Sequence, residues 1–113
     1  MKGTLLIALL ALASPFAHAG GDAGAGAQKS KVCAACHGAD FNTPISADIP
    51  RLAGQHEDYL VRALSDYKSG ARKNPVMGGQ AGALSAQDIQ DLAAYISGLP
   101  GKLKIIPLQR LVR

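Results

Sequence analysis

The sequence predicts an all-α fold, because apolar residues recur at helical spacing in two segments and strand patterns are nearly absent. The first segment, over residues 55–69, brings apolar and aromatic side chains onto one helical face: Tyr59, Leu60, Ala63, Leu64 and Tyr67. The second segment carries a similar stripe, made of Ile89, Leu92, Ala93 and Ile96. Glycine and proline are frequent between the segments, so we expect short helices joined by loops.

The N-terminal part of the expected domain begins with a helix. Residues 22–35 have Asp22 as a candidate N-cap, although two glycines in this stretch lower its helix propensity. The next segment, residues 38–54, is expected to form an extended loop, because it contains three residues that disfavour a helix, Asn42, Pro44 and Pro50.

Three further elements are expected after this loop. The helix over residues 55–69 ends at Gly70, and a glycine-rich loop over residues 74–82 carries Met77. Residues 85–88, Ser-Ala-Gln-Asp, have the pattern of a capping box that opens the last helix. A glycine and a proline that follow its apolar stripe are expected to end this helix.

The chain of 113 residues has room for one domain behind an N-terminal targeting segment. Residues 1–19 have the features of a secretory signal: Lys2, an apolar run over residues 5–13 and a small-x-small cleavage site over residues 17–19. An uncleaved anchor is the alternative, but the apolar run falls short of the roughly 20 residues that span a bilayer. We therefore expect export to the periplasm, a signal peptide over residues 1–19 cleaved after Ala19, a domain over residues 20–100 and a basic C-terminal extension over residues 101–113.

The charge of the chain is only mildly positive. Removing residues 1–19 takes away one charged residue, a lysine, and leaves 11 basic and 8 acidic residues, a formal charge of +3. No dense run of lysine and arginine with interleaved aromatics occurs, so nucleic-acid binding is not expected. Acidic protein partners fit this balance. The basic extension over residues 101–113 has four open roles: packing on the domain, docking on an acidic partner, contact with an anionic membrane surface, and a disordered tail.

One short motif points to a specific chemistry. It has the form C-x-x-C-H, the attachment signature of c-type haem, and reads Cys33-Ala34-Ala35-Cys36-His37. Two thiols at this spacing on a helical turn can each form a thioether to one vinyl group of the porphyrin, while the adjacent histidine binds the iron. We therefore predict one covalently bound haem c, with thioethers to Cys33 and Cys36 and with His37 as an axial iron ligand. The porphyrin would also fill a core that is poor in large rings.

Three other roles of the cysteine pair are alternatives to haem attachment. A thioredoxin-like redox pair expects a βαβ context, and no strand pattern precedes Cys33. A structural zinc site needs four ligands, of which only Cys33, Cys36 and His56 are available. A plain structural disulfide is compatible with an oxidising compartment, but it would not explain the histidine that follows Cys36.

The second axial ligand follows by elimination, since residues 20–113 contain one methionine, Met77, and one histidine besides His37, which is His56. Met77 lies in a glycine-rich segment that can wrap to the opposite face of the haem, so we predict it as the ligand. The alternatives are a core-filling methionine and ligation by His56. Ligation by two histidines would lower the reduction potential, whereas a thioether sulfur raises it.

The motifs, taken together, resemble the class I cytochromes c, in particular small bacterial ones with one such domain or two in tandem. The resemblance covers residues 20–99 and rests on four stretches in the order of the family: Cys33-Ala34-Ala35-Cys36-His37-Gly38, Ile49-Pro50-Arg51-Leu52-Ala53-Gly54-Gln55, Asn74-Pro75-Val76-Met77 and Leu92-Ala93-Ala94-Tyr95-Ile96. It implies a cytochrome c-like helical domain wrapped around one covalently bound haem.

The resemblance also implies roles for three residues. In that family the backbone carbonyl of a proline accepts the imidazole N–H on the proximal side of the haem, a role that falls to Pro50. The first and last helices of the family cross closely, with a glycine against an aromatic ring, and Gly26 and Tyr95 are the pair implied here. A merely weak helix end is the alternative reading of Gly26.

These observations predict a one-electron carrier with His/Met ligation that shuttles electrons between respiratory or dehydrogenase partners and has no catalytic residues. The expected partners are redox proteins with acidic docking patches. The alternative is a ligand-binding, sensing or peroxidase-like c-type haem protein in which Met77 does not bind the iron and the sixth position is open.

Overall fold

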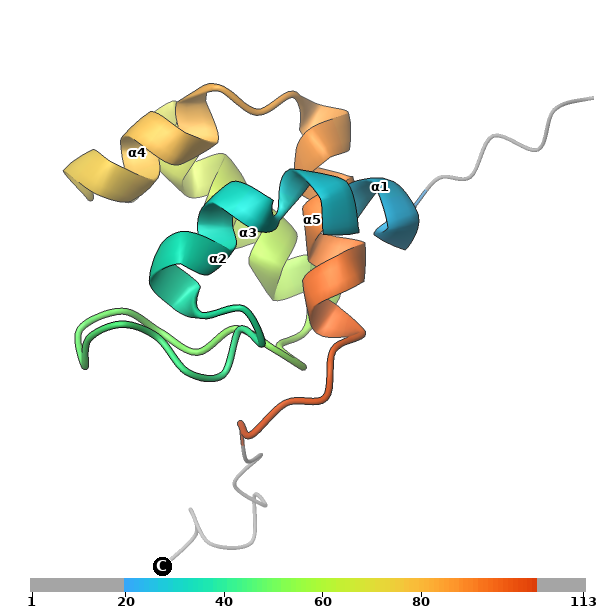
Figure 1. Ribbon diagram of the computed structural model, residues 1–113. Helices are drawn as coiled ribbons and strands as arrows, with labels where there is room; N and C mark the ends of the chain where they lie inside the picture. The colour runs from blue at the N-terminus through green and yellow to red at the C-terminus, as the bar shows by residue number, and fades with distance from the viewer. Residues whose placement is uncertain (1–19, 104–113) are drawn as a thin grey trace, which may run out of the picture.

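The computed structural model describes residues 20–103, which form five helices and contain no strand (Figure 1). The helices are α1 (Ala23–Lys29), α2 (Lys31–His37), α3 (Glu57–Ser69), α4 (Pro75–Gly82) and α5 (Ala86–Ser97). The prediction of an all-α fold is confirmed. The expected signal peptide and most of the basic extension lie outside the described residues. Within the described part of the chain, the helices are too short and polar to span a membrane.

The first helical segment differs from the prediction, because the single helix expected over residues 22–35 is divided at Ser30 into α1 and α2. The side chain of Ser30 is buried and its hydroxyl donates to the carbonyl oxygen of Ala27 at 2.9 Å. A side chain that bonds the preceding turn competes with the helical backbone, and this accounts for the interruption. The predicted N-cap is confirmed, since the Asp22 carboxylate accepts from the backbone N–H of Gly24 and Ala25.

Helices α1 and α5 cross at very short range. A Cβ built on Gly26 would overlap the carbonyl oxygen of Asp91 and would lie 2.8 Å from Cβ of Tyr95. Only a residue without a side chain fits at this crossing. The predicted contact between Gly26 and Tyr95 is therefore confirmed, and the alternative of a weak helix end is wrong.

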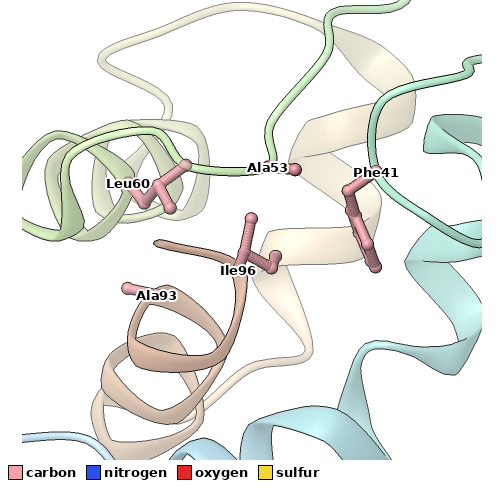
Figure 2. Packing of buried hydrophobic residues seen from close by; sticks show 5 residues of the cluster. All are labelled: Phe41, Ala53, Leu60, Ala93 and Ile96. Carbon is pink, nitrogen blue, oxygen red and sulfur yellow. The ribbon is translucent and has the colours of Figure 1, made fainter. Parts of the chain in front are cut away.

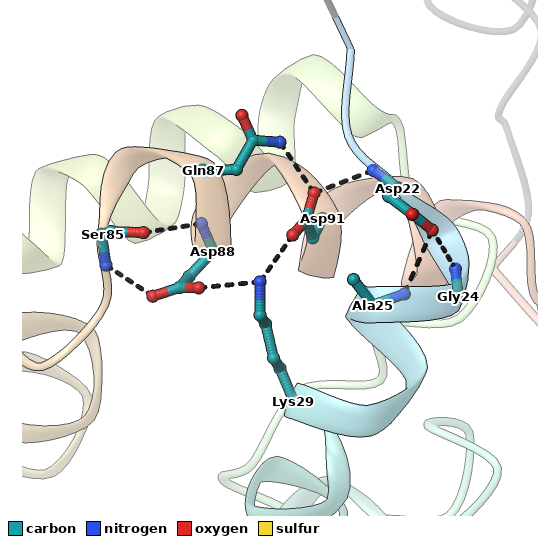
Figure 3. Close-up of polar contacts among 8 residues, drawn as sticks. All are labelled: Asp22, Gly24, Ala25, Lys29, Ser85, Gln87, Asp88 and Asp91. Atoms are coloured by element: carbon teal, nitrogen blue, oxygen red, sulfur yellow. Dashed lines mark hydrogen bonds and ion pairs between the residues drawn. The ribbon is translucent and has the colours of Figure 1, made fainter. Parts of the chain in front are cut away.

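A network of charged groups stabilises this crossing (Figure 3). The ammonium group of Lys29 lies 2.8 Å from a carboxylate oxygen of Asp88 and 2.6 Å from one of Asp91. Asp91 is buried and also accepts from the backbone N–H of Asp22 and the side-chain amide of Gln87. Hydrogen bonds from Lys29 lower the pKa of both carboxyl groups to about 2. The charges thus join the last turn of α1 to the first half of α5.

The capping box predicted for α5 is confirmed. The Ser85 hydroxyl accepts from the backbone N–H of Asp88 at 3.0 Å, and the Asp88 carboxylate accepts from the backbone N–H of Ser85 at 2.8 Å. Two orphan backbone donors are satisfied in this way, as is typical of the motif.

The glycine-rich segment expected to be a loop is a helix, and that prediction was wrong. α4 begins after Asn74, whose side chain accepts from the backbone N–H of Val76 and Met77, and Pro75 occupies its first position. An asparagine cap followed by proline favours a helix start strongly enough to outweigh the glycines that follow. α3 begins at Glu57, two residues later than predicted, and ends at Gly70 in a left-handed conformation, as expected.

Buried apolar residues from three parts of the chain form the core (Figure 2). They come from the segment between α2 and α3, from α3 and from α5: Phe41, Ala53, Leu60, Ala93 and Ile96. Among the described residues, the largest fully buried side chains are those of Phe41, which is 1% exposed, and Leu92, which is 2% exposed. Phe41 is the one aromatic side chain among the buried residues of this cluster.

The segment after α5 packs on the segment between α2 and α3. The side-chain amide of Asn42 donates to the carbonyl oxygen of Pro100 at 2.8 Å and accepts from the backbone N–H of Lys102 at 3.0 Å. A Cβ on Gly101 would overlap the Ala53 carbonyl oxygen, so the two backbones cross without side chains between them. The first residues of the expected extension are thereby fixed against the domain.

Candidate functional site

His37 is the last residue of α2, and its imidazole is buried with 6% exposure. Its Nδ1 atom lies 2.9 Å from the carbonyl oxygen of Pro50. A carbonyl oxygen can only accept, so Nδ1 carries the proton and Nε2 keeps a lone pair that can bind a metal. The contact with Pro50 is the one that the family resemblance implied.

The cysteines of the motif lie on the same helix as His37. Cys33 and Cys36 are free thiols, and both are half-buried. Burial raises the pKa of the Cys33 thiol. A redox-active cysteine of the thioredoxin kind needs the opposite shift, because the thiolate is the reacting form. The electrostatics therefore do not favour the thiol–disulfide alternative.

The zinc alternative also finds no support in the described residues. Over residues 20–103, no three histidine, cysteine or acidic side chains come together as potential metal ligands. His56 lies at the N-cap position of α3, with an exposed side chain that makes no capping hydrogen bond. His56 is thus exposed, whereas His37 is buried.

Met77 lies on the first turn of α4 and is half-buried. Its backbone N–H donates to the Asn74 side chain at 3.0 Å, so the cap fixes the turn that carries its thioether. α4 packs against α3, and the ammonium group of Lys68 on α3 donates to the carbonyl oxygen of Gly82 at the last residue of α4. A cation at a helix C-terminus is favourable. Met77 is therefore on an anchored helix rather than on a free loop.

The segment that supports His37 contains residues that sequence reasoning missed. Gly38 has φ of 90°, and a Cβ there would overlap the carbonyl oxygen of Thr43. The Asp40 carboxylate accepts from the backbone N–H of Asn42 and Thr43 and from the Thr43 hydroxyl. These bonds lower the pKa of Asp40, with the Asn42 N–H as the largest cause. An Asp-x-Asn-Thr pattern after a glycine is a turn signal, and it could have predicted this tight turn.

The end of the segment is tied back to α2. The backbone N–H of Ile45 donates to the carbonyl oxygen of Cys36 at 3.0 Å, and the carbonyl oxygen of Phe41 accepts from the backbone N–H of Leu52 and Ala53. Pro50 lies between these two anchors along the chain. The fold thus holds the carbonyl that faces the imidazole.

Comparison with known proteins identifies the family. Residues 22–100 match the family model described as cytochrome c. Cytochrome c4 of Pseudomonas aeruginosa is 47% identical over 98 residues, which is 86% of this chain and 48% of the relative. Cytochrome c-554(548) of Halomonas halodenitrificans is 41% identical over 80 residues, 68% of this chain and 95% of the relative.

A solved structure gives the same result. The crystal structure of reduced recombinant cytochrome c4 from Pseudomonas stutzeri matches with a TM-score of 0.68 and 43% identity, and the match covers 74% of this chain and 48% of that chain. The chain spans about half the length of the cytochromes c4 that it matches. By its sequence and by its fold, the chain belongs to the cytochrome c family, whose attachment motif at residues 33–37 implies one covalently bound haem c.

Proposed function

We propose that this protein is a periplasmic one-electron carrier in which Cys33 and Cys36 hold the haem by thioethers and His37 and Met77 bind its iron. The observation that carries the proposal is the imidazole of His37, which is buried and engaged through Nδ1 with Pro50 next to two free thiols. The bound haem supplies a reversible one-electron couple at its iron.

The donor set fits a covalently attached haem. Each free thiol can add across one vinyl group, with the hydrogen of S–H going to carbon, and two such bonds fix the orientation of the ring. His37 follows directly in the chain, at the end of the same helix, with Nε2 free for the iron.

Pro50 tunes the proximal side in this proposal. Its carbonyl oxygen accepts the Nδ1–H of His37, which fixes the tautomer and restricts rotation of the ring. The same hydrogen bond makes Nε2 a better electron donor, so it strengthens the bond to the metal. Pro50 is therefore assigned a positioning role and not a ligand role.

Met77 is assigned to the other face. The Asn74 cap and the contact between Lys68 and Gly82 fix both ends of α4, so the Met77 side chain would be held on an anchored helix when it binds the iron. A sulfur ligand raises the reduction potential relative to a second imidazole. With His37 and Met77 both holding the iron, small molecules would be kept off it, and this favours a carrier over a ligand-binding or peroxidase-like protein.

The proposed partners are redox proteins with acidic docking patches. Val32 and Val76 are 61% and 66% exposed, and each immediately precedes a residue that we assign to the haem. Exposed apolar residues of this kind suit small and short-lived interfaces. The net positive charge of residues 20–113 can steer such a protein toward acidic surfaces. The signal-like residues 1–19 support the periplasmic location.

Two measurements on the purified full-chain protein test the proposal. Extraction with acidified acetone should leave the haem with the polypeptide, because thioethers survive a treatment that removes a non-covalent haem. The ferric protein should show the weak red absorption band of iron–sulfur ligation, and the reduced protein should not bind carbon monoxide at neutral pH. Ready carbon monoxide binding would instead support the ligand-binding alternative, and a colourless protein would support a thiol–disulfide function.

A further inference from the structure

We infer that Phe41 is a positioning residue for His37, setting both the plane of the imidazole and the place of the carbonyl that binds it. The inference rests on the proposed function, since it takes His37 as an axial ligand. Three independent observations carry it: the backbone conformation of Phe41, its carbonyl contacts and the stacking of its ring.

The backbone of Phe41 is in an unfavourable conformation. Its φ is 55°, and among the described residues it is the only non-glycine with positive φ. A bulky side chain in the left-handed region is an outlier, and such strain persists only where surrounding contacts enforce it. Here the enforcing contacts are the backbone bond from Phe41 N–H to Gly38 and the carboxylate bonds of Asp40 to the next turn. A glycine would fit this backbone without strain, so the phenyl ring is held at a cost.

The carbonyl oxygen of Phe41 holds the segment that contains Pro50. It accepts from the backbone N–H of Leu52 at 2.8 Å and of Ala53 at 3.1 Å, two and three residues after Pro50. The carbonyl of Pro50 in turn lies 2.9 Å from Nδ1 of His37. A shift in the Phe41 backbone would therefore move the acceptor of the imidazole N–H.

The ring of Phe41 acts on the same imidazole directly. Its centroid lies 6.5 Å from that of His37, with an angle of 16° between the planes. On the other side Tyr95 meets the Phe41 ring edge-on, at 6.4 Å and 86°. Figure 2 shows the Phe41 side chain on the segment after α2, with Ala53 and Ile96 to its left. The Phe41 ring thus lies near-parallel to the imidazole within stacking range, and Tyr95, which lies at the crossing of α1 and α5, packs edge-on against the Phe41 ring.

Phe41 thus connects Tyr95, at the crossing of α1 and α5, with His37. A residue that only filled the core would not need the near-parallel ring pair with His37 or the strained backbone. The orientation of an axial imidazole determines the magnetic anisotropy of a ferric low-spin haem, so its signature can be measured separately from stability. The second readout is the hydrogen exchange of the Leu52 and Ala53 amides relative to amides of α5, which reports on the segment that holds Pro50.

Three variants of the haem-loaded full chain provide the test. Phe41→Leu keeps most of the apolar volume and removes the planar ring, and Phe41→Gly suits the backbone and also removes the ring. Leu92→Ala is the matched control, because Leu92 is buried on α5 to a similar degree but is not in the cluster around Phe41. We expect shifted and broadened paramagnetic resonance signals in both Phe41 variants. In Phe41→Leu we also expect the two amides to exchange roughly fivefold faster relative to the amides of α5, the factor for losing about one hydrogen bond. Phe41→Gly suits the backbone and should keep the wild-type exchange of these amides.

The control decides between positioning and packing. Leu92→Ala should unfold at lower denaturant concentration and keep the wild-type resonance signal. If the Phe41 variants keep the wild-type signal and relative exchange, or if Leu92→Ala shifts them equally, the inference is wrong. Should Phe41→Leu fail to fold, Phe41→Gly still tests the effect of the missing ring on the resonance signal. A wild-type protein that lacks the low-spin imidazole signal altogether contradicts the proposed function and not this inference alone.

Discussion

Gly26→Ala tests the crossing of α1 and α5, which holds the N-terminal helices and thereby the motif at residues 33–37. The added methyl group would overlap the carbonyl oxygen of Asp91 and lie 2.8 Å from Cβ of Tyr95. A backbone carbonyl inside a helix cannot turn away as a flexible side chain can. The two helices must therefore separate, and the contacts along their crossing weaken.

The magnitude follows from two opposing effects. Overpacking a close contact costs typically 1–3 kcal/mol, and we place this site at about 3 kcal/mol because the obstacle is backbone. Alanine in place of glycine inside a helix gains about 1 kcal/mol. The net expectation for Gly26→Ala is a loss of about 2 kcal/mol in the free energy of unfolding.

The assay is denaturant unfolding of the haem-loaded protein, followed by far-ultraviolet circular dichroism. The matched control is Gly79→Ala, because Gly79 is an exposed residue of α4 and a Cβ there meets nothing within 4 Å. This variant should gain up to about 1 kcal/mol. If Gly26→Ala is as stable as Gly79→Ala, the close crossing does not constrain the fold and the reasoning fails.

Three further predictions concern the site and the charge network. Cys36→Ser should lose most of its covalent haem, measured as haem that acid–acetone removes, and a wild-type amount of retained haem would rule out the thioether. Met77→His should stay low-spin with a potential lower by tenths of a volt, within the roughly 0.8 V that axial ligands span, and an unchanged potential in a redox titration would mean that Met77 is not a ligand. The pKa of Asp88 and Asp91 is lowered to about 2 from 3.8, so their stabilisation is complete above about pH 4 and is lost as the pH falls toward 2. Lys29→Met should flatten this acid dependence of unfolding, and an unaltered profile would show that the ion pairs do not contribute.

Local patterns predicted the elements whose signals agree with one another. The apolar face over residues 55–69 corresponds to α3, and the Ser85 to Asp88 pattern marks the start of α5. The loop predicted around Met77 is a helix, because the Asn74-Pro75 start signal outweighs the low helix propensity of the glycines that follow. The division of the first helix at Ser30 was not predicted, because it depends on a hydrogen bond from the Ser30 hydroxyl to the Ala27 carbonyl oxygen. Helix propensities do not include such a bond.

The residues that support His37 could be predicted only in part. The role of Pro50 came from the family resemblance, and the structure has its carbonyl 2.9 Å from the imidazole. The positioning role of Phe41 could not be predicted, because the sequence carries no local signal for a non-glycine residue with positive φ. The Asn42 bridge to Pro100 and Lys102 joins residues about sixty positions apart, and such pairing depends on the whole fold.

The mass of the denatured protein, purified from the periplasm, tests the central claim most directly. The account predicts a polypeptide that begins at Gly20 and carries the mass of one haem through unfolding and extraction. A polypeptide of the same length without that added mass would contradict it.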